Sequence, residues 1–161
     1  MRKILPCSPS VSYEKEPLPE VASHILEECR MVLPGIQALF GFQLIVVFNG
    51  RFWDGLTSGQ RVLHLAAMTL VAVAVALVMT PAAYHRQVLR DAVSHFFIEF
   101  SSRCLLFSMA PLLLGIALDM YLIADLILAS TVPALLVSLF LAGLYIGLWF
   151  ILPRMLRPGF P

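Results

Sequence analysis

The sequence predicts an all-α, polytopic membrane protein with four transmembrane helices and an N-terminal amphipathic helix on the cytoplasmic side. Composition gives the first reason: 60% of the 161 residues are hydrophobic and only 13% are charged, whereas soluble domains carry roughly 25% charged residues. The second reason is that the charges leave four long apolar runs, each near the roughly 20 residues that a helix needs to cross a bilayer. A net charge of +1 provides no basic surplus, so nucleic-acid binding is excluded.

The N-terminal region divides into a tail and a short helix. Residues 1–18 are rich in Pro, Ser and charge, so we expect a flexible tail. Residues 19–30 are predicted to form the amphipathic juxtamembrane helix, because Val21, Ile25 and Cys29 recur at helical spacing after Pro19. The opposite face carries Glu20, His24, Glu27 and Glu28. An acidic face predicts contact with protein rather than with anionic lipid.

A transmembrane domain is predicted over residues 31–153, with spans at about 31–49, 62–83, 104–124 and 131–152. The first and fourth spans contain no charged side chain or histidine, the second contains only His64, and the third contains a single charged side chain, Asp119. Strands of a membrane barrel alternate in polarity, whereas residues 70–77 (LVAVAVAL) do not. The spans are therefore predicted to be helices, followed by a short C-terminal tail at 154–161.

Two connections lie between these spans on opposite sides of the membrane. Residues 84–103 show helical spacing and form either a separate interfacial helix or an inward extension of the third span. Within them, Glu99 and Arg103 are four residues apart, in the favourable order for a helical ion pair. Residues 125–131 predict a tight external hairpin, with Ser130 or Thr131 beginning the last helix.

The basic residues predict the orientation. Nine lie in the two tails and in the connection after the second span, and only Arg51 and Arg61 lie on the other side; the nine are Arg2, Lys3, Lys15, Arg30, Arg86, Arg90, Arg103, Arg154 and Arg157. Both termini are therefore predicted to be cytoplasmic. The three cysteines, Cys7, Cys29 and Cys104, fall on the same side, where thiols stay reduced, so neither a disulfide nor a metal cluster is predicted.

Three ordered segments carry a family resemblance: residues 27–37 (EECRMVLPGIQ), 41–43 (GFQ) and 81–86 (PAAYHR). Together they resemble a bacterial family of small four-helix membrane proteins of unknown function, some of whose members carry an automatic sodium:proton antiporter label. The resemblance covers roughly residues 27–153. It implies a bacterial inner-membrane protein and brings no established substrate or catalytic residue.

Polar groups inside the spans are the first candidate functional residues. Asp119 is the only carboxylate in a span, and near the external end of its helix it is predicted to cap, or to pair with Arg51 or Arg61. A proton or cation site is the alternative. Gln37 and Gln43 carry amides that lipid cannot satisfy, so both are predicted to bond to neighbouring helices.

The four histidines raise the question of a bound cofactor. His24 and His95 lie outside the spans, whereas His64 and His85 lie near opposite ends of the second span. No two histidines are predicted to face each other at one depth, so surface or interfacial roles are favoured over haem ligation. No cofactor is predicted beyond bound lipid; haem or chlorophyll ligation by His64 or His85 is kept as a weaker hypothesis.

Small residues supply the best interaction motif. Gly143 and Gly147 are four apart in the fourth span, and Ala72 and Ala76 form a similar face on the second. Such faces let helices approach closely in lipid, either within the chain or against a partner protein.

The function predicted from these features is a non-enzymatic accessory or structural subunit of a larger membrane complex, of respiratory or photosynthetic type, with integral membrane subunits and lipids as partners. No Ser/His/Asp order, phosphate loop or zinc-protease motif appears, so an enzyme is not predicted. The alternative is a homodimeric proton or cation transporter that uses Asp119, with Gln37 and Gln43 lining its path. A pigment or haem holder is a third hypothesis.

Overall fold

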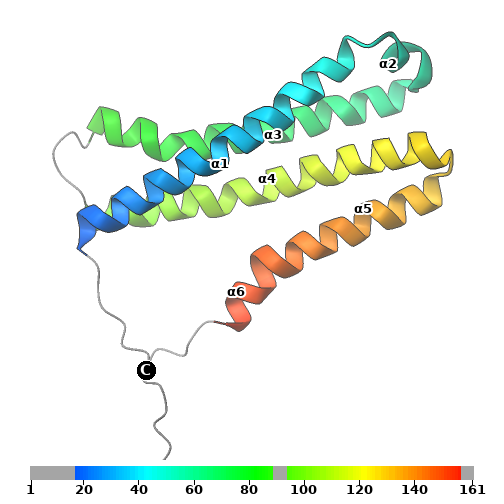
Figure 1. Ribbon diagram of the computed structural model, residues 1–161. Coiled ribbons are helices and arrows are strands. Elements are labelled where there is room, and N and C mark those ends of the chain that lie inside the picture. Colours follow the sequence, from blue (N-terminus) through cyan, green and yellow to red (C-terminus); the bar gives the residue numbers. More distant parts are fainter. Residues whose placement is uncertain (1–16, 89–93, 157–161) are drawn as a thin grey trace, which may run out of the picture.

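The computed structural model describes residues 17–88 and 94–156, except the side chain of Arg51. The described residues fold entirely into helices and turns, which confirms the all-α prediction. The long helices are α1 (Leu18–Val47), α3 (Ser58–Val88), α4 (His95–Leu128) and α5 (Thr131–Ile146). The short elements are α2 (Gly50–Gly55), the π-helical turn η1 (Gly147–Ile151) and α6 (Leu152–Met155). The long helices run alternately in opposite directions, so α2 and the α4–α5 turn share one end (Figure 1).

Four segments are long and apolar enough to cross a membrane: α1, α3, α4 and the continuous run from α5 to α6. This indicates a multi-pass membrane protein. At roughly 1.5 Å per residue, α3 and α4 are about 46 and 51 Å long, so both exceed the roughly 30 Å of hydrocarbon. Helices of this length tilt or extend into the interfacial regions.

Helix boundaries differ from the sequence expectations in one instructive way. The proposed juxtamembrane helix at 19–30 and the first span at 31–49 form the single helix α1. The buried residues Ile25, Cys29 and Ile36 continue one apolar face across the expected boundary, and Pro34 is accommodated inside the helix. The acidic residues Glu20, Glu27 and Glu28 lie on its exposed side. Most of the expected flexible tail, residues 1–16, lies outside the described residues.

The two readings of residues 84–103 are resolved in part. Ser94 caps α4, because its hydroxyl accepts a hydrogen bond from the Phe97 N–H at 3.2 Å. Residues from His95 onward therefore extend the third span, and residues 89–93 lie outside the described part. Glu99 and Arg103 form the predicted ion pair at 2.6 Å, with both side chains exposed.

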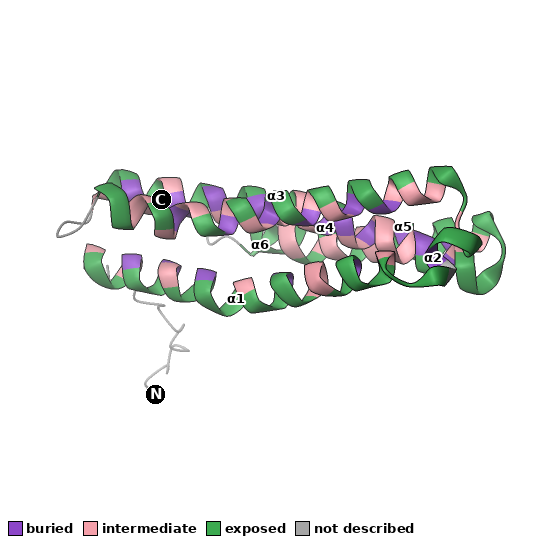
Figure 2. Ribbon diagram, turned by 90° about the horizontal axis from the view of Figure 1, so that it is seen from above, coloured by how far each residue is buried: buried purple, intermediate pink, exposed green. Residues whose placement is uncertain are grey.

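Helices α3 and α4 form the centre of the bundle, and α1 packs against both. Ala67, Val71 and Ala74 on α3 are completely buried, and Figure 2 shows buried positions recurring along this helix. A core cluster joins Cys29 and Ile36 of α1 to Val71 and Val78 of α3. In the fourth span, α5 packs chiefly on α4.

Candidate functional site

A cluster of three polar side chains joins α1, α3 and α4 near the α2 end of the bundle, and we call it the polar triad. Gln43 Nε2 of α1 donates a hydrogen bond to Asp119 Oδ2 of α4. His64 Nδ1 of α3 lies 3.2 Å from Asp119 Oδ1, and its Nε2 lies 3.1 Å from the backbone oxygen of Gln43. Gln43 and His64 are buried, and the Asp119 side chain is 14% exposed. The triad thus connects three spans with polar contacts.

The contacts of His64 constrain the charge of the triad. Each ring nitrogen faces an oxygen, one on a carboxyl group and one on a backbone carbonyl. An imidazolium beside a carboxylate satisfies both contacts, and so does a neutral imidazole beside a protonated carboxyl group.

The antiparallel course of the helices explains why these residues meet. Gln43 lies near the end of α1, His64 near the start of α3, and Asp119 in the last third of α4. All three helix ends lie at the α2 end of the bundle (Figure 1). Within its own span, each of the three residues gives no sign of the other two, so their convergence is not predicted from the sequence. Comparing how far each residue lies from its hairpin would have revealed it.

A cavity of about 200 Å³ adjoins the triad. Its wall includes Gln43, His64 and Asp119, and its remaining lining is apolar. Phe52 of α2 is buried over the triad, with its ring centroid 5.4 Å from that of His64. The lining residues Phe42 and Val46 of α1 and Leu126 of α4 are 69%, 45% and 63% exposed. The cavity therefore opens between α1 and α4, toward the bilayer.

One expectation about the partner of Asp119 needs correction. Asp119 contacts His64 and Gln43 rather than Arg61. Arg61 instead donates to the backbone oxygen of Leu56 at 3.1 Å and lies 5.5 Å from the centre of the Trp53 ring. These local contacts hold the guanidinium on the α2 side of α3. The side chain of Arg51, the other expected partner, lies outside the described residues.

The two histidines in α3 differ in setting. His64 is buried rather than interfacial as expected, and both its ring nitrogens already have partners, so it has no nitrogen free for haem or pigment ligation. His85 is half-buried against the ring of Phe97, with 5.6 Å between ring centroids. Among the described residues, no group of three or more His, Cys, Asp or Glu side chains is arranged to hold a metal ion.

The predicted packing residues also separate into two groups. Gln43 bonds across helices as expected, whereas Gln37 is exposed. Ala72 and Ala76 lie on the exposed side of α3, because the α3–α4 contact uses Ala67, Val71 and Ala74 instead. A Cβ atom added at Gly143 or Gly147 would meet nothing within 4 Å.

The family of unknown function DUF6328 matches residues 15–153 of the chain. The chain therefore belongs to this family. No curated protein matches the chain, and no solved structure matches it either.

Proposed function

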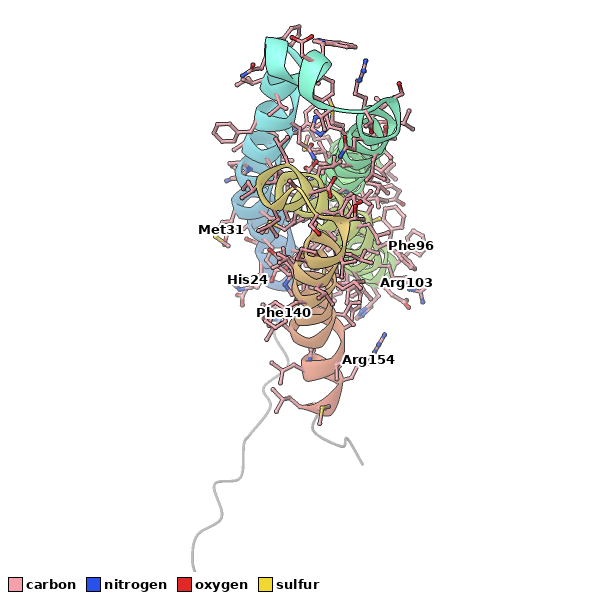
Figure 3. All side chains as sticks on the ribbon, turned by 90° about the vertical axis from the view of Figure 1, so that its right-hand side faces the viewer. His24, Met31, Phe96, Arg103, Phe140 and Arg154 are labelled. Atoms are coloured by element: carbon pink, nitrogen blue, oxygen red, sulfur yellow. The ribbon has the colours of Figure 1, made fainter. Side chains whose placement is uncertain are left out.

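We propose that this DUF6328 member is a non-enzymatic integral membrane subunit that packs against and stabilises a larger membrane complex in a bacterial inner membrane. One observation carries the proposal: the fourth span is nearly uncovered by its own chain. In its apolar 18-residue window 6% of residues are buried, against 11% for α1 and 28% for α3 and for α4. The exposed residues Met31 and Phe140 point away from the bundle on α1 and α5 (Figure 3).

Small residues lie on two sides of the fourth span, the side that packs on α4 and the side that faces away from it. Ala134 and Ser138 bury against α4, and the Ser138 hydroxyl donates to the Ala117 backbone oxygen at 2.6 Å. At about 100° per residue, Gly143 lies about 180° from Ala134, and Gly147 lies about 180° from Ser138. Their side of the helix faces away from α4 and offers a close backbone approach to another membrane helix.

The proposed orientation puts the end opposite α2 in the cytoplasm. Arg30, Arg86, Arg103 and Arg154 all lie in the half of the bundle away from α2, where α1 and α4 begin and α3 and α6 end. Arg61 lies at the α2 end. This asymmetry supports cytoplasmic termini by the positive-inside rule.

The experiment is purification of the full chain from its native membrane in mild detergent, followed by mass spectrometry. We expect one or more integral membrane proteins in stoichiometric amount. The Gly143→Leu/Gly147→Leu double variant is expected to lose them, whereas Gly35→Leu, a matched change at an open position of α1, retains them. Migration of the wild-type chain alone in every mild detergent would end the proposal.

The polar triad favours one second candidate, a homodimeric proton or cation transporter that uses Asp119. A carboxyl group inside a membrane helix is costly and is often retained for ion transfer. Because Gln37 is exposed, the path in this version runs past Gln43 and His64 only.

Reconstituted vesicles test the transporter directly. Wild-type protein is expected to produce an ion-driven pH change inside the vesicles, and Asp119→Asn is expected to abolish it. Glu99→Gln, which neutralises an exposed carboxylate, serves as the control and is expected to keep the flux. Absence of flux from the wild type would exclude this candidate.

A further inference from the structure

A second cavity lies between α1 and α3, toward the end of the bundle opposite α2, and we call it the α1–α3 cavity. Its volume is about 430 Å³, and these two helices supply all of its lining. Two guanidinium groups line it, one from Arg30 of α1 and one from Arg86 of α3, together with the half-buried ring of His85. Among the described residues, no carboxylate lines this cavity. It therefore offers positive charge from two helices to one ligand.

The two guanidinium groups are not engaged elsewhere in the described structure. Arg30 and Arg86 are exposed, and neither forms an ion pair or a hydrogen bond with another described residue. An adjoining cavity shares Arg30 and His85 with the first, and Glu27 also lines it. Two arginines against this one carboxylate leave a surplus of positive charge, whatever the protonation state of His85. The surface therefore favours an anion.

The two arginines lie where the apolar part of each helix ends. Arg30 immediately precedes the charge-free run at 31–49, and Arg86 comes three residues after the apolar run at 62–83. These runs are long enough to occupy the hydrocarbon, so the arginines that flank them lie at the level of the lipid headgroups. Anionic groups at that level are the phosphates of lipids.

The lining of the cavity changes along the bundle. Toward the middle of the helices, the arginines give way to Leu33, Val78 and Met79. Met79 is 44% exposed, and it belongs to the apolar run, so its exposed surface meets lipid. The α1–α3 cavity is thus charged at its outer end and apolar at its inner end, which is the polarity of a phospholipid with its chains in the bilayer.

We propose that the α1–α3 cavity binds one anionic phospholipid, with Arg30 and Arg86 donating to its phosphate oxygens and an acyl chain lying along Leu33 and Met79. A guanidinium group matches phosphate because its N–H donors form a planar fork, and basic pockets between membrane helices suit anionic headgroups. A free phosphate ion shares this headgroup chemistry but leaves the apolar inner end unused. The site is separate from the α5 surface and does not depend on the proposed subunit role.

Native mass spectrometry of the full chain in dodecyl maltoside measures the binding. The lipid probes are dioleoyl-phosphatidylglycerol, which is anionic, and dioleoyl-phosphatidylcholine, which has the same chains and no net charge. We expect phosphatidylglycerol to bind about tenfold more tightly than phosphatidylcholine, the ratio that about 1.4 kcal/mol gives. Inorganic phosphate and glycerophosphoglycerol, which carry no acyl chain, are expected not to displace it.

Two double variants test the role of the arginines. Arg30→Gln/Arg86→Gln is expected to bring the ratio between the two lipids close to one. Arg103→Gln/Arg154→Gln is the matched control, because it removes the same amount of positive charge at the same end of the bundle, from α4 and α6. The control is expected to keep the ratio of the wild type.

A pair of neighbouring alanines tests the location. Ala82 is half-buried and lines the α1–α3 cavity, so Ala82→Leu fills part of it and is expected to weaken phosphatidylglycerol binding about tenfold. Ala83 is exposed, and Ala83→Leu is expected to leave this binding unchanged.

Equal binding of the two lipids by the wild type would overturn the proposal and identify the cavity as a non-selective lipid contact. Displacement of phosphatidylglycerol by inorganic phosphate would overturn it in favour of a free phosphate ion. An equal loss of selectivity in Arg103→Gln/Arg154→Gln would show that net charge acts rather than the cavity. Because the first two outcomes need only the wild type, a misfolded variant leaves the test intact.

Discussion

The α3–α4 contact and the outer face of α5 are both built on glycine, yet they have opposite surroundings. A Cβ atom at Gly115 of α4 would lie 2.8 Å from Val71 Cγ2 and 3.1 Å from the Ala67 backbone oxygen. The same atom at Gly143 or Gly147 would meet nothing within 4 Å. The space beside Gly115 is therefore occupied by α3, whereas the space beside Gly143 and Gly147 is open.

Polar contacts follow the same division. The bundle of α1, α3 and α4 is joined by the polar triad, whereas α5 is tied to α4 by the Ser138 hydrogen bond. Because apolar surface gives no driving force between helices in lipid, close packing and hydrogen bonds determine which helices associate. Polar contacts thus join the first three spans to one another, and the fourth span packs on α4 through one face.

The largest effect is expected from His64→Leu on the packed side. The variant leaves the Asp119 carboxyl group with Gln43 as its remaining partner, and breaking a buried pair in this way costs about 3 kcal/mol. We expect a loss of that order in the free energy of unfolding, measured by circular dichroism in mixed micelles with increasing SDS. His85→Leu, at a half-buried ring without an ion pair, is the control and is expected to cost less than about 1 kcal/mol.

The double variant His64→Leu/Asp119→Leu sharpens this result. Removing both members of a buried pair is often close to neutral, so we expect most of the lost stability to return. A double variant less stable than His64→Leu alone would show that the triad does not act as a pair.

The next effect is expected from Gly115→Leu at the α3–α4 contact. The added side chain must displace Val71 and the α3 backbone, and overpacking of this kind costs about 2 kcal/mol. Unfolding in mixed micelles measures the loss. An unchanged stability would mean that α3 and α4 separate easily. The contrast between the packed Gly115 and the open Gly143 and Gly147 would then have no energetic consequence.

A smaller effect is expected from Ser138→Ala. The variant removes one interhelical hydrogen bond and leaves the Ala117 carbonyl within its own helix, so the cost is about 1 kcal/mol or less. Protease accessibility of the α4–α5 turn is expected to rise together with this loss. Ser102→Ala, at an exposed position of α4, is the control and is expected to change neither quantity.

Sequence alone predicts the four apolar spans, because apolar length is a property of each segment by itself, whereas the separate juxtamembrane helix expected at 19–30 is part of α1. It does not predict which glycines contact a neighbouring helix. Gly143 and Gly147 have the four-residue spacing of a helix-packing motif, whereas the tightly packed Gly115 has no second glycine at that spacing on its helix. It also does not predict the contact between Asp119 and His64, because the two residues are 55 positions apart in the chain and their equal depth in the bundle is not evident from that distance. Contacts between helices depend on rotation and depth together, and a single apolar span specifies neither closely.

The smallest effect on the isolated chain is expected from Gly143→Leu combined with Gly147→Leu. Both positions face open space opposite the α4 contact, so the added side chains meet lipid or detergent and displace nothing of this chain. We expect the free energy of unfolding in mixed micelles to change by less than about 0.5 kcal/mol, although each substitution is larger in volume than Ser138→Ala. A loss comparable with that of Gly115→Leu would show that α5 packs through this face on another part of the chain. Unchanged stability together with loss of co-purifying proteins from the native membrane would instead show that these glycines act in association and not in folding. The added side chains would then block only the approach of a helix from another protein.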